Sequence, residues 1–338
     1  MDIIRPVFFR LIILLLLALD AGSPSIVFSN NHLPPFKQGV VIVSVNGYIM
    51  VMAYTNKHDL PLPVVRALTS FEKSEKVEGL RVTTLIDAPR ISQLRQRHKA
   101  PDEDVSTMLY RILGSAAHLI FQDGAKGLSN SYIPEERVSC EVDGTTISGQ
   151  IDFQFIEDDE VNVIDYKVTA AYSIIYGKPE WEKQLNVYAF LLRHGKGMRV
   201  KNLSVCAIIR DWTARRATTT KGYPASPIVE VPVKMWTDEE QDRYVSHRVQ
   251  LHINATAIED LDGSLPLCTD EERWAKPKVF AVYKEGRASA LKLFDNQADA
   301  EKFASKSLDR KVVERPATYT KCAGDYCRVA QHCDQWGL

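Results

Sequence analysis

Two acidic residues and a lysine occupy positions in a pair of apolar segments where they could support metal-dependent chemistry. Asp152 lies in 146–156, whose alternating polar and apolar residues predict a strand with this carboxylate aimed away from the apolar side. Asp165 and Lys167 lie two residues apart in a second predicted strand, 161–168, so both side chains leave it from the same face. The short acidic turn between the two segments predicts a hairpin.

A hairpin would place the two carboxylates side by side. Together with the backbone carbonyl of Tyr166 they are hard oxygen ligands of the kind that Mg²⁺ or Mn²⁺ prefers. Lys167 could then orient or help deprotonate an attacking water, and the metal would polarise a phosphoryl oxygen. This chemistry suits the cutting of a phosphodiester. Taken alone, an Asp-x-Lys pair equally fits a solvated strand face with one ion pair.

Four ordered motifs distinguish this chain from one with an isolated Asp-x-Lys pair. They are Gly-Ser-Ala-Ala-His at 114–118, Gly-Gln-Ile-Asp at 149–152, Ile-Asp-Tyr-Lys at 164–167 and Gln-Leu-Asn-Val-Tyr at 184–188. In this combination the sequence resembles the RecB-like exonuclease branch of the PD-(D/E)xK nuclease superfamily. The resemblance implies a Mg²⁺-dependent deoxyribonuclease, expected to be an exonuclease, that acts in recombination, repair or phage DNA processing.

The resemblance also implies roles for single residues. Asp152, Asp165 and Lys167 would be catalytic, with His118 completing a metal shell formed by the two aspartates and the Tyr166 carbonyl. Gln184 and Tyr188 lie four residues apart on a predicted helix, share its face, and would line the path of the DNA. Without the resemblance, His118 would be read as an ordinary half-buried helix histidine and Tyr188 as a core residue.

Contacts with DNA must be local, because 42 basic and 43 acidic side chains leave a formal net charge of −1. The segment 210–216 mixes cations with an aromatic ring, which suits backbone contact and base stacking. Its candidate DNA-binding residues are Arg210, Trp212, Arg215 and Arg216. A second basic segment, 90–99, is a weaker candidate. Either segment could instead be a charged surface without a ligand.

Hydrophobic periodicity predicts the elements that position these residues. Helical patterns cover 105–122, with a buried apolar stripe, and also 181–194, 236–261 and 298–305. Strand patterns cover 205–210 and, as two short strands, 279–294. The order helix, hairpin, helix, strand predicts an α/β fold: a central mixed β-sheet flanked by helices, a restriction-endonuclease-like core, with a small C-terminal α+β appendage. No phosphate-cradling loop occurs, which argues against an ATP-driven motor.

The first 51 residues leave two possible starts for the functional chain. A basic segment followed by the apolar run 11–19 looks like a secretory signal, and this run is too short to span a membrane. We instead expect translation to begin at Met50 or Met52 and the protein to be cytoplasmic. The expected divisions are a leader or mis-assigned upstream translation at 1–51, a nuclease core with an N-terminal helical part at 52–265, and an α+β element with a cysteine-rich tail at 266–338.

Three of the six cysteines crowd into the last seventeen residues, as Cys322, Cys327 and Cys333. They resemble the C-terminal cysteine cluster that encloses an iron-sulfur centre in some RecB-like nucleases. A fourth ligand is needed. Cys206 lies in an apolar strand and Cys140 beside the first strand of the hairpin, so we choose Cys268, in a loop before a helix. The resemblance favours a [4Fe-4S] cluster, with Zn²⁺ as the alternative.

Two other functions compete with that of a nuclease. The first is a non-catalytic DNA-end-binding module of the same fold, although such a module would usually lack the lysine or one carboxylate. The second is a secreted cysteine-containing binding protein, which rests on the leader alone. The expected partners are DNA, as ends or single strands, and a helicase or recombination protein; no membrane partner is expected.

Overall fold

The computed structural model of the chain describes residues 39–45, 48–69, 78–98, 103–259, 265–324 and 326–336. Most of the predicted leader lies outside the described residues. The chain divides into two compact units, residues 1–75 with 101–116, and residues 76–100 with 117–338. The domain boundaries expected from the sequence stay a prediction. In the part of the chain that is described, no helix is long and apolar enough to cross a membrane.

The first unit contains a hairpin of β1 (Gly39–Val45) and β2 (Tyr48–Thr55), paired antiparallel. The end of β2 also pairs in parallel with the short strand β4 (Glu103–Asp104). Met50 and Met52 lie inside β2 and pair with residues of β1. A chain that began at either methionine would therefore lack β1, the antiparallel partner of β2. The late start itself stays a prediction.

The helical part of the first unit forms a small core of its own. Leu68 of α2 (Leu62–Thr69) packs with Val105 and Met108 of the 3-10 helix η2 (Val105–Met108), and all three side chains are buried. The buried carboxylate of Asp104 caps η2 by accepting the backbone N–H of Ser106 at 3.1 Å.

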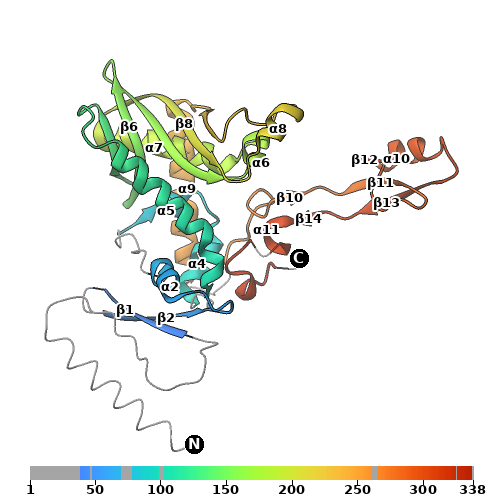
Figure 1. The fold of residues 1–338 in the computed structure, drawn as a ribbon, viewed down its shortest axis with the longest axis horizontal. Coiled ribbons are helices and arrows are strands. Elements are labelled where there is room, and N and C mark those ends of the chain that lie inside the picture. Colours follow the sequence, from blue (N-terminus) through green and yellow to red (C-terminus); the bar gives the residue numbers. More distant parts are fainter. Residues whose placement is uncertain are drawn as a thin grey trace, which may run out of the picture. The chain divides into compact units, whose positions relative to one another are not determined.

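The second unit is built on a six-stranded mixed sheet (Figure 1). Its strands are β3 (Leu80–Arg81), β5 (Tyr132–Val142), β6 (Thr145–Glu157), β7 (Glu160–Thr169), β8 (Arg199–Ile209) and β9 (Ile228–Val233). Strand β6 pairs antiparallel with β5 and β7, whereas β7 pairs in parallel with β8. The predicted hairpin is confirmed as β6 and β7. The prediction of a central mixed sheet flanked by helices is also confirmed.

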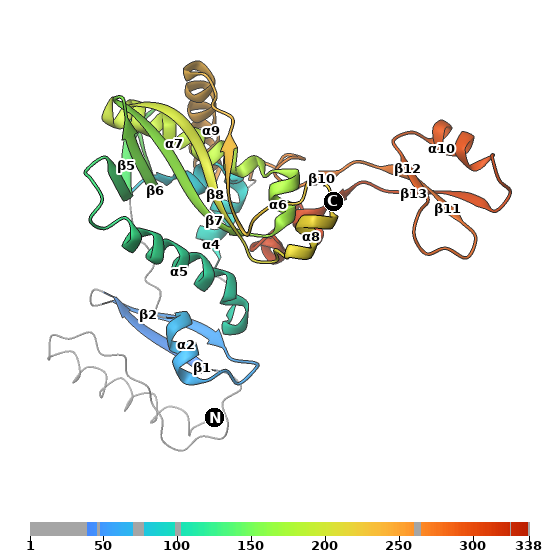
Figure 2. The ribbon, with the colours of Figure 1, turned by 45° about the horizontal axis from the view of Figure 1, so that its top comes forward.

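Helix α7 (Pro179–Lys196) covers one face of this sheet (Figure 2). Proline in its first turn and Gly197 at its C-terminal end, with a φ of 65°, mark the two ends in the usual way. Its apolar side chains form the core with those of the four strands β5, β6, β7 and β8. The fully buried members of this core include Ile147, Ile151, Val163, Leu185, Leu191, Leu192 and Val205.

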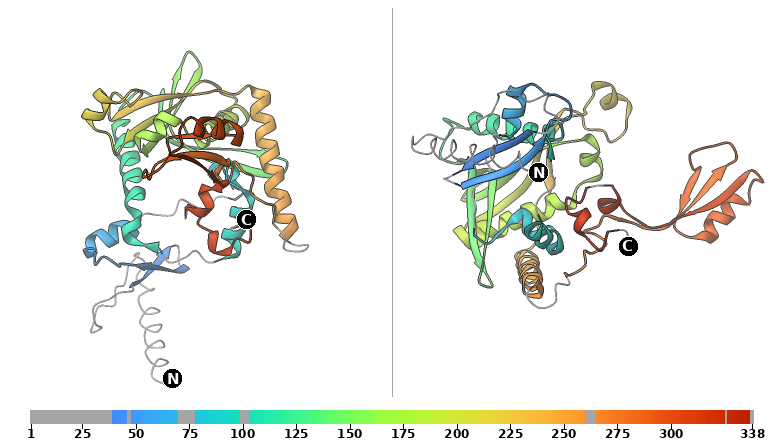
Figure 3. Two further views of the ribbon diagram at one scale, coloured as in Figure 1. Left: turned by 90° about the vertical axis from the view of Figure 1, so that its right-hand side faces the viewer. Right: turned by 90° about the horizontal axis from the view of Figure 1, so that it is seen from below.

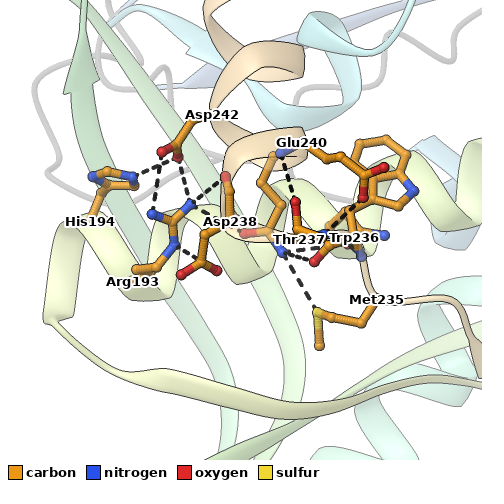
Figure 4. Close-up of polar contacts among 10 residues, drawn as sticks. Arg193, His194, Met235, Trp236, Thr237, Asp238, Glu240 and Asp242 are labelled. Carbon is orange, nitrogen blue, oxygen red and sulfur yellow. Dashed lines mark hydrogen bonds and ion pairs between the residues drawn. The ribbon is translucent and has the colours of Figure 1, made fainter.

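Helix α9 (Asp238–Glu259) packs against α7 and is held there by polar contacts (Figures 3 and 4). Arg193 of α7 donates to the Asp242 carboxylate at 2.5 Å. At the start of α9, Thr237 and Glu240 bond reciprocally, the Thr237 N–H to Glu240 Oε2 and the Glu240 N–H to Thr237 Oγ1. This capping box explains where the helix begins. It ends close to the C-terminal limit expected from the sequence.

The remaining elements are short. They are α3 (Val82–Leu85), α4 (Pro89–Arg97), α6 (Ala171–Tyr176), α8 (Ala214–Thr219), β10 (Ala275–Lys276), β14 (Thr318–Tyr319), α11 (Thr320–Ala323) and the 3-10 helix η3 (Ala330–His332). The predicted C-terminal α+β appendage is confirmed. It consists of the strands β11 (Val279–Lys284), β12 (Lys292–Phe294) and β13 (Arg310–Arg315) with the helix α10 (Gln297–Ala304).

The prediction for residues 105–122 is partly wrong. The segment is helical, as η2 followed by α5 (Leu109–Gly124), but no residue of α5 is buried. Leu109 is 53% exposed and Ile120 is 66% exposed. Helical spacing alone therefore identified the helix, but it did not show which side chains the rest of the fold covers.

Candidate active site

The sheet forks at Asp152. Strand β5 pairs along one edge of β6, so β3 and β7 must share the other edge. They pair with different halves of β6 and leave residues 149–152 between them. Here the Asp152 carboxylate accepts the backbone N–H of Tyr166 in β7 at 2.8 Å. A side chain thus replaces a backbone bond between the two strands.

His118, Glu135 and Asp152 form an acidic cluster at this fork. The Nδ1 atom of His118 lies 3.0 Å from Glu135 Oε1 and 3.5 Å from Asp152 Oδ1. One ligand atom from each residue lies within 4.8 Å of the others, and the three could hold a metal ion. The three side chains come from α5, β5 and β6, so the cluster depends on the packing of α5 beside the two strands.

Glu135 was not predicted as a site residue. It lies in β5, a strand that the sequence analysis missed, and its φ of +52° is left-handed, which is uncommon for a residue other than glycine. Because of this irregularity, the pairing of β5 with β6 is interrupted between Pro134 and Glu136. The carboxylate is turned toward His118 as a result. No local sequence signal identifies such a conformation at a glutamate.

Asp165 and Lys167 lie on the same face of β7, as predicted. Lys167 Nζ lies 2.7 Å from Asp165 Oδ2. The other oxygen of Asp165 accepts from Gln184 Nε2 at 3.1 Å, and Gln184 Nε2 also donates to the Tyr188 hydroxyl at 2.8 Å. Helix α7 thus supports the catalytic candidates through Gln184. Tyr188 is only 4% exposed, and its predicted contact with DNA stays a prediction.

Gly149 explains how Tyr188 is placed. A Cβ at this position would lie 2.6 Å from Tyr188 Cε1 and 2.9 Å from Val82 Cγ2. Both distances are shorter than a real Cβ contact, so the ring can approach the sheet only because this residue is glycine. The glycine of the Gly-x-x-Asp motif therefore has a packing role beside the fork.

Burial and neighbouring charges shift the pKa values of the side chains at the fork. Burial and the nearby Asp165 raise the pKa of Asp152 to about 7. The hydrogen bond with Glu135 raises the pKa of His118. Burial alone would lower the pKa of Lys167, but Asp165 and Asp152 raise it above its ordinary value. In the absence of a metal, the lysine is therefore a protonated hydrogen-bond donor.

The predicted DNA-binding segment 210–216 includes the start of α8. The Trp212 indole N–H donates to the Pro224 carbonyl at 2.9 Å, so this ring is engaged within its own loop. Arg215 and Arg216 are exposed on α8. The prediction for the segment 90–99 is wrong at Arg90, which is 3% exposed and donates to the Leu265 carbonyl at 2.8 Å. This arginine helps to hold the C-terminal tail.

The four predicted cysteine ligands line one cavity, although Cys268 is far from the tail in sequence. Burial raises the pKa of Cys268 to about 12. Gln335 fastens the tail to the loop of Cys268 through two bonds, of 2.8 and 2.9 Å. Arg90 Nε donates to Cys333 Sγ at 3.3 Å. The rejected alternatives, Cys140 and Cys206, lie instead in β5 and β8.

Comparisons with known proteins do not identify a family. No family model matches the sequence, and no curated protein matches it. Similar solved structures include the crystal structure of SSO0001, which is 18% identical with a TM-score of 0.39 and covers 63% of this chain and 87% of that chain. Another is a protein from Eubacterium rectale described as a candidate exonuclease, 13% identical with a TM-score of 0.27, which covers 61% of this chain and 76% of that chain.

Proposed function

We propose that this protein is a metal-dependent nuclease that hydrolyses phosphodiester bonds in DNA, most specifically as an exonuclease. The observation that carries this proposal is the convergence of Asp152, Asp165, His118 and Lys167 at the fork of the sheet. Two buried carboxylates are held close enough to raise the pKa of one of them, and a protonated lysine lies beside them. Two carboxylates buried side by side destabilise the fold unless a bound cation or substrate offsets their repulsion.

The residues at the fork fit Mg²⁺ or Mn²⁺. The ligand atoms of His118, Glu135 and Asp152 lie close enough together to hold an ion, and they offer carboxylate oxygens and one imidazole nitrogen. We propose that Asp165, whose charge acts on Asp152, would join Asp152 and His118 as a ligand, as the resemblance implies. The N–H and C=O of one residue in a strand point to the same side, so the Tyr166 carbonyl also faces the side of Asp152. A bound metal would supply Lewis-acid polarisation of a phosphoryl oxygen.

The other side chains act as donors and supports. As an ammonium group, Lys167 can orient the attacking water or neutralise charge that develops on a phosphoryl oxygen. Gln184 fixes one oxygen of Asp165 and leaves the other for Lys167. Glu135 accepts from His118 Nδ1 when that atom carries a proton, which orients the ring. Arg210, Arg215 and Arg216 would contact the DNA backbone.

For the cysteine cavity we propose a structural [4Fe-4S] cluster, with Zn²⁺ as the alternative. Cys268, Cys322, Cys327 and Cys333 would be its ligands. The four thiols line one cavity, and each could supply one ligand to a cluster or to a zinc ion. The resemblance to RecB-like nucleases favours the cluster.

The competing function is a DNA-end-binding module without catalysis. It would need no lysine beside the carboxylates, so the 2.7 Å contact between Lys167 and Asp165 favours the enzyme. On either function we propose DNA ends or single strands as the ligand and a helicase or recombination protein as a partner. We also propose a cytoplasmic location and a role in recombination, repair or phage DNA processing.

The proposed function is tested by incubating the protein with end-labelled linear DNA and with circular DNA, in Mg²⁺ and in EDTA. We expect Mg²⁺-dependent cleavage of the linear DNA, and a loss of about 10²–10⁴-fold in rate for Lys167→Ala, Asp165→Ala or Asp152→Asn. The matched control is Lys201→Ala, which removes an exposed lysine paired with Glu157 at 2.9 Å in the same sheet. Cleavage at the parental rate by Lys167→Ala would show that the assignment is wrong.

A further inference from the structure

The helix that follows the catalytic strand exposes two aromatic rings that the fold does not use. Tyr172 and Tyr176 lie one turn apart on α6 and are 60% and 78% exposed. Their rings are parallel, with an interplanar angle of 1° and centroids 5.8 Å apart. The two stacked rings form a small aromatic surface that remains in water. Neither ring packs into the core, so folding does not explain them.

The rest of α6 holds this surface in place. Ala171 is fully buried, and its N–H donates to the Asp211 carboxylate at 2.7 Å. Ile174, on another side of the helix, packs against the main core. Buried residues thus anchor the helix while Tyr172 and Tyr176 remain outside. The rings are presented in a defined orientation.

This surface lies close to the proposed catalytic centre. Lys167 is five residues before Tyr172 in the chain, which limits the distance between their Cα atoms to at most about 18 Å. Strand β7 leads directly into α6. A DNA strand bound at the fork therefore needs to extend only a short distance to reach the rings.

Positive charge lies beside the rings. The Arg210 N–H bonds to the Thr169 carbonyl at 2.9 Å, and this contact joins the start of α6 to the segment that leads into α8. Helices α6 and α8 lie side by side in Figures 1 and 2. Arg215 and Arg216 are exposed on α8, and neither has an ion-pair partner among the residues that the structure describes. The chain as a whole has no excess of positive charge, so this pairing of rings and cations is local.

We propose that Tyr172 and Tyr176 form a stacking surface for the bases of single-stranded DNA beside the active site. Flat rings next to cations suit a ligand with π-faces and an anionic backbone. In a duplex the base faces are already covered by their neighbours, and only a single strand or an opened end can offer them. This inference rests on the proposed nuclease function and adds a preference for single strands that enter the site.

The test measures binding in EDTA, where metal-dependent cleavage cannot consume the probe. The probes are a fluorescent oligothymidylate and a fluorescent duplex whose ends are closed by linkers that carry no bases, and binding is followed by anisotropy. We expect Tyr172→Ala and Tyr176→Ala each to weaken binding of the oligothymidylate about tenfold, with little effect on the closed duplex. The double variant Tyr172→Phe with Tyr176→Phe keeps both rings and should bind like the parent.

Tyr110→Ala is the matched control, because Tyr110 is 59% exposed in the first unit. The proposal is overturned if a double variant, Tyr172→Ala with Tyr176→Ala, binds oligothymidylate like the parent. It is equally overturned if the double phenylalanine variant loses as much affinity for oligothymidylate as the double alanine variant. A loss of affinity for the closed duplex as large as the loss for oligothymidylate would also overturn it.

Cleavage measured in parallel separates this inference from the proposed function. If the parent cuts DNA in Mg²⁺ and ring removal does not weaken single-strand binding, only the stacking surface is wrong. If binding depends on the rings but the parent never cuts DNA, only the nuclease is wrong. Lys201→Ala, the control of the proposed function, should keep both cleavage and affinity for oligothymidylate.

Discussion

The acidic site at the fork and the cysteine site near the C-terminus are built in opposite ways. At the fork, backbone bonds to β8 place Asp165 and Lys167 on β7, and the bond from the Tyr166 N–H ties the Asp152 carboxylate to the same strand. At the cysteine site, Cys322, Cys327 and Cys333 lie on or beside α11 and η3, which are only four and three residues long. Regular structure holds the first site. Side-chain contacts such as those of Gln335 hold much of the second.

This difference predicts how each site depends on its metal. A centre held by a sheet should keep its shape when the metal is removed, so variants there should lose chemistry and not the fold. A tail with little regular structure should gain order from its metal, because binding and folding are then coupled. On the proposed function, the two sites would separate a catalytic from a structural use of metal within one chain.

The largest expected effect is at the cysteine site. Cys268→Ser should lose the bound metal and lower Tm by roughly 5–10 °C, because the tail loses its link to the core. Metal content is measured after anaerobic purification, together with absorbance near about 400 nm, which indicates iron-sulfur if present. Cys140→Ser, in β5, is the control and should retain the metal. Unchanged metal content in Cys268→Ser would contradict the choice of fourth ligand.

The hairpin and its chemistry were predictable from the sequence because they depend on local alternation. The spacing of Asp165 and Lys167 is enough to place both on one face of any strand. The alternation predicted for β6 fails at the fork, however. Ile151 belongs to the core beneath α7, but the Phe153 ring contacts Tyr166, which in turn packs on Phe121 of α5. The two residues therefore do not share one apolar face as predicted.

The features that could not be predicted from the sequence have a common physical cause. The fork arises because β3, from far upstream, pairs with the same edge of β6 as β7 does. Such long-range pairing leaves no local signal. Strand β5 was missed because Pro134 interrupts its pattern, and Glu135 was missed with it. The basic segment that contains Arg90 was misjudged because composition cannot distinguish a surface arginine from one buried beside Cys333.

A smaller effect should show that the fork depends on packing and not on a metal. Gly149→Ala places a Cβ 2.6 Å from the Tyr188 ring. We expect a loss of about 1–3 kcal/mol in the free energy of unfolding. The displaced Tyr188 would also release Gln184 from Asp165, so cleavage should slow. Gly114→Ala is the control, because a Cβ there meets nothing within 4 Å and lies in α5.

Denaturant unfolding in EDTA measures both glycine variants. The Gly114→Ala variant should be unchanged or more stable by about 0.5–1 kcal/mol, since alanine favours a helix. Equal stability of the two variants would mean that the fork tolerates movement of Tyr188. The fork would then not be the more rigid of the two sites, and its difference from the cysteine site would not hold.

The smallest expected effect concerns the cost of the ionised Asp152 carboxylate at the fork. The pKa of Asp152 is about 7 in the folded protein, against about 3.9 for an unfolded aspartate. The folded state therefore binds more protons than the unfolded state between these values, and its stability falls as pH rises from about 4 to about 7. Above that range the full cost of the ionised carboxylate is present. Asparagine avoids this cost and can still accept the Tyr166 N–H.

In EDTA, Asp152→Asn should therefore be more stable than the parent at pH 8, by on the order of 1 kcal/mol because the titration is shared with neighbouring groups. The difference should vanish near pH 4, where the parental carboxyl is already neutral when folded. Asp159→Asn, in the exposed turn of the same hairpin, is the control and should show no such pH dependence. Thermal unfolding across this pH range is the measurement, and a variant less stable than the parent at pH 8 would mean that the fork stores no charge repulsion for a metal to relieve.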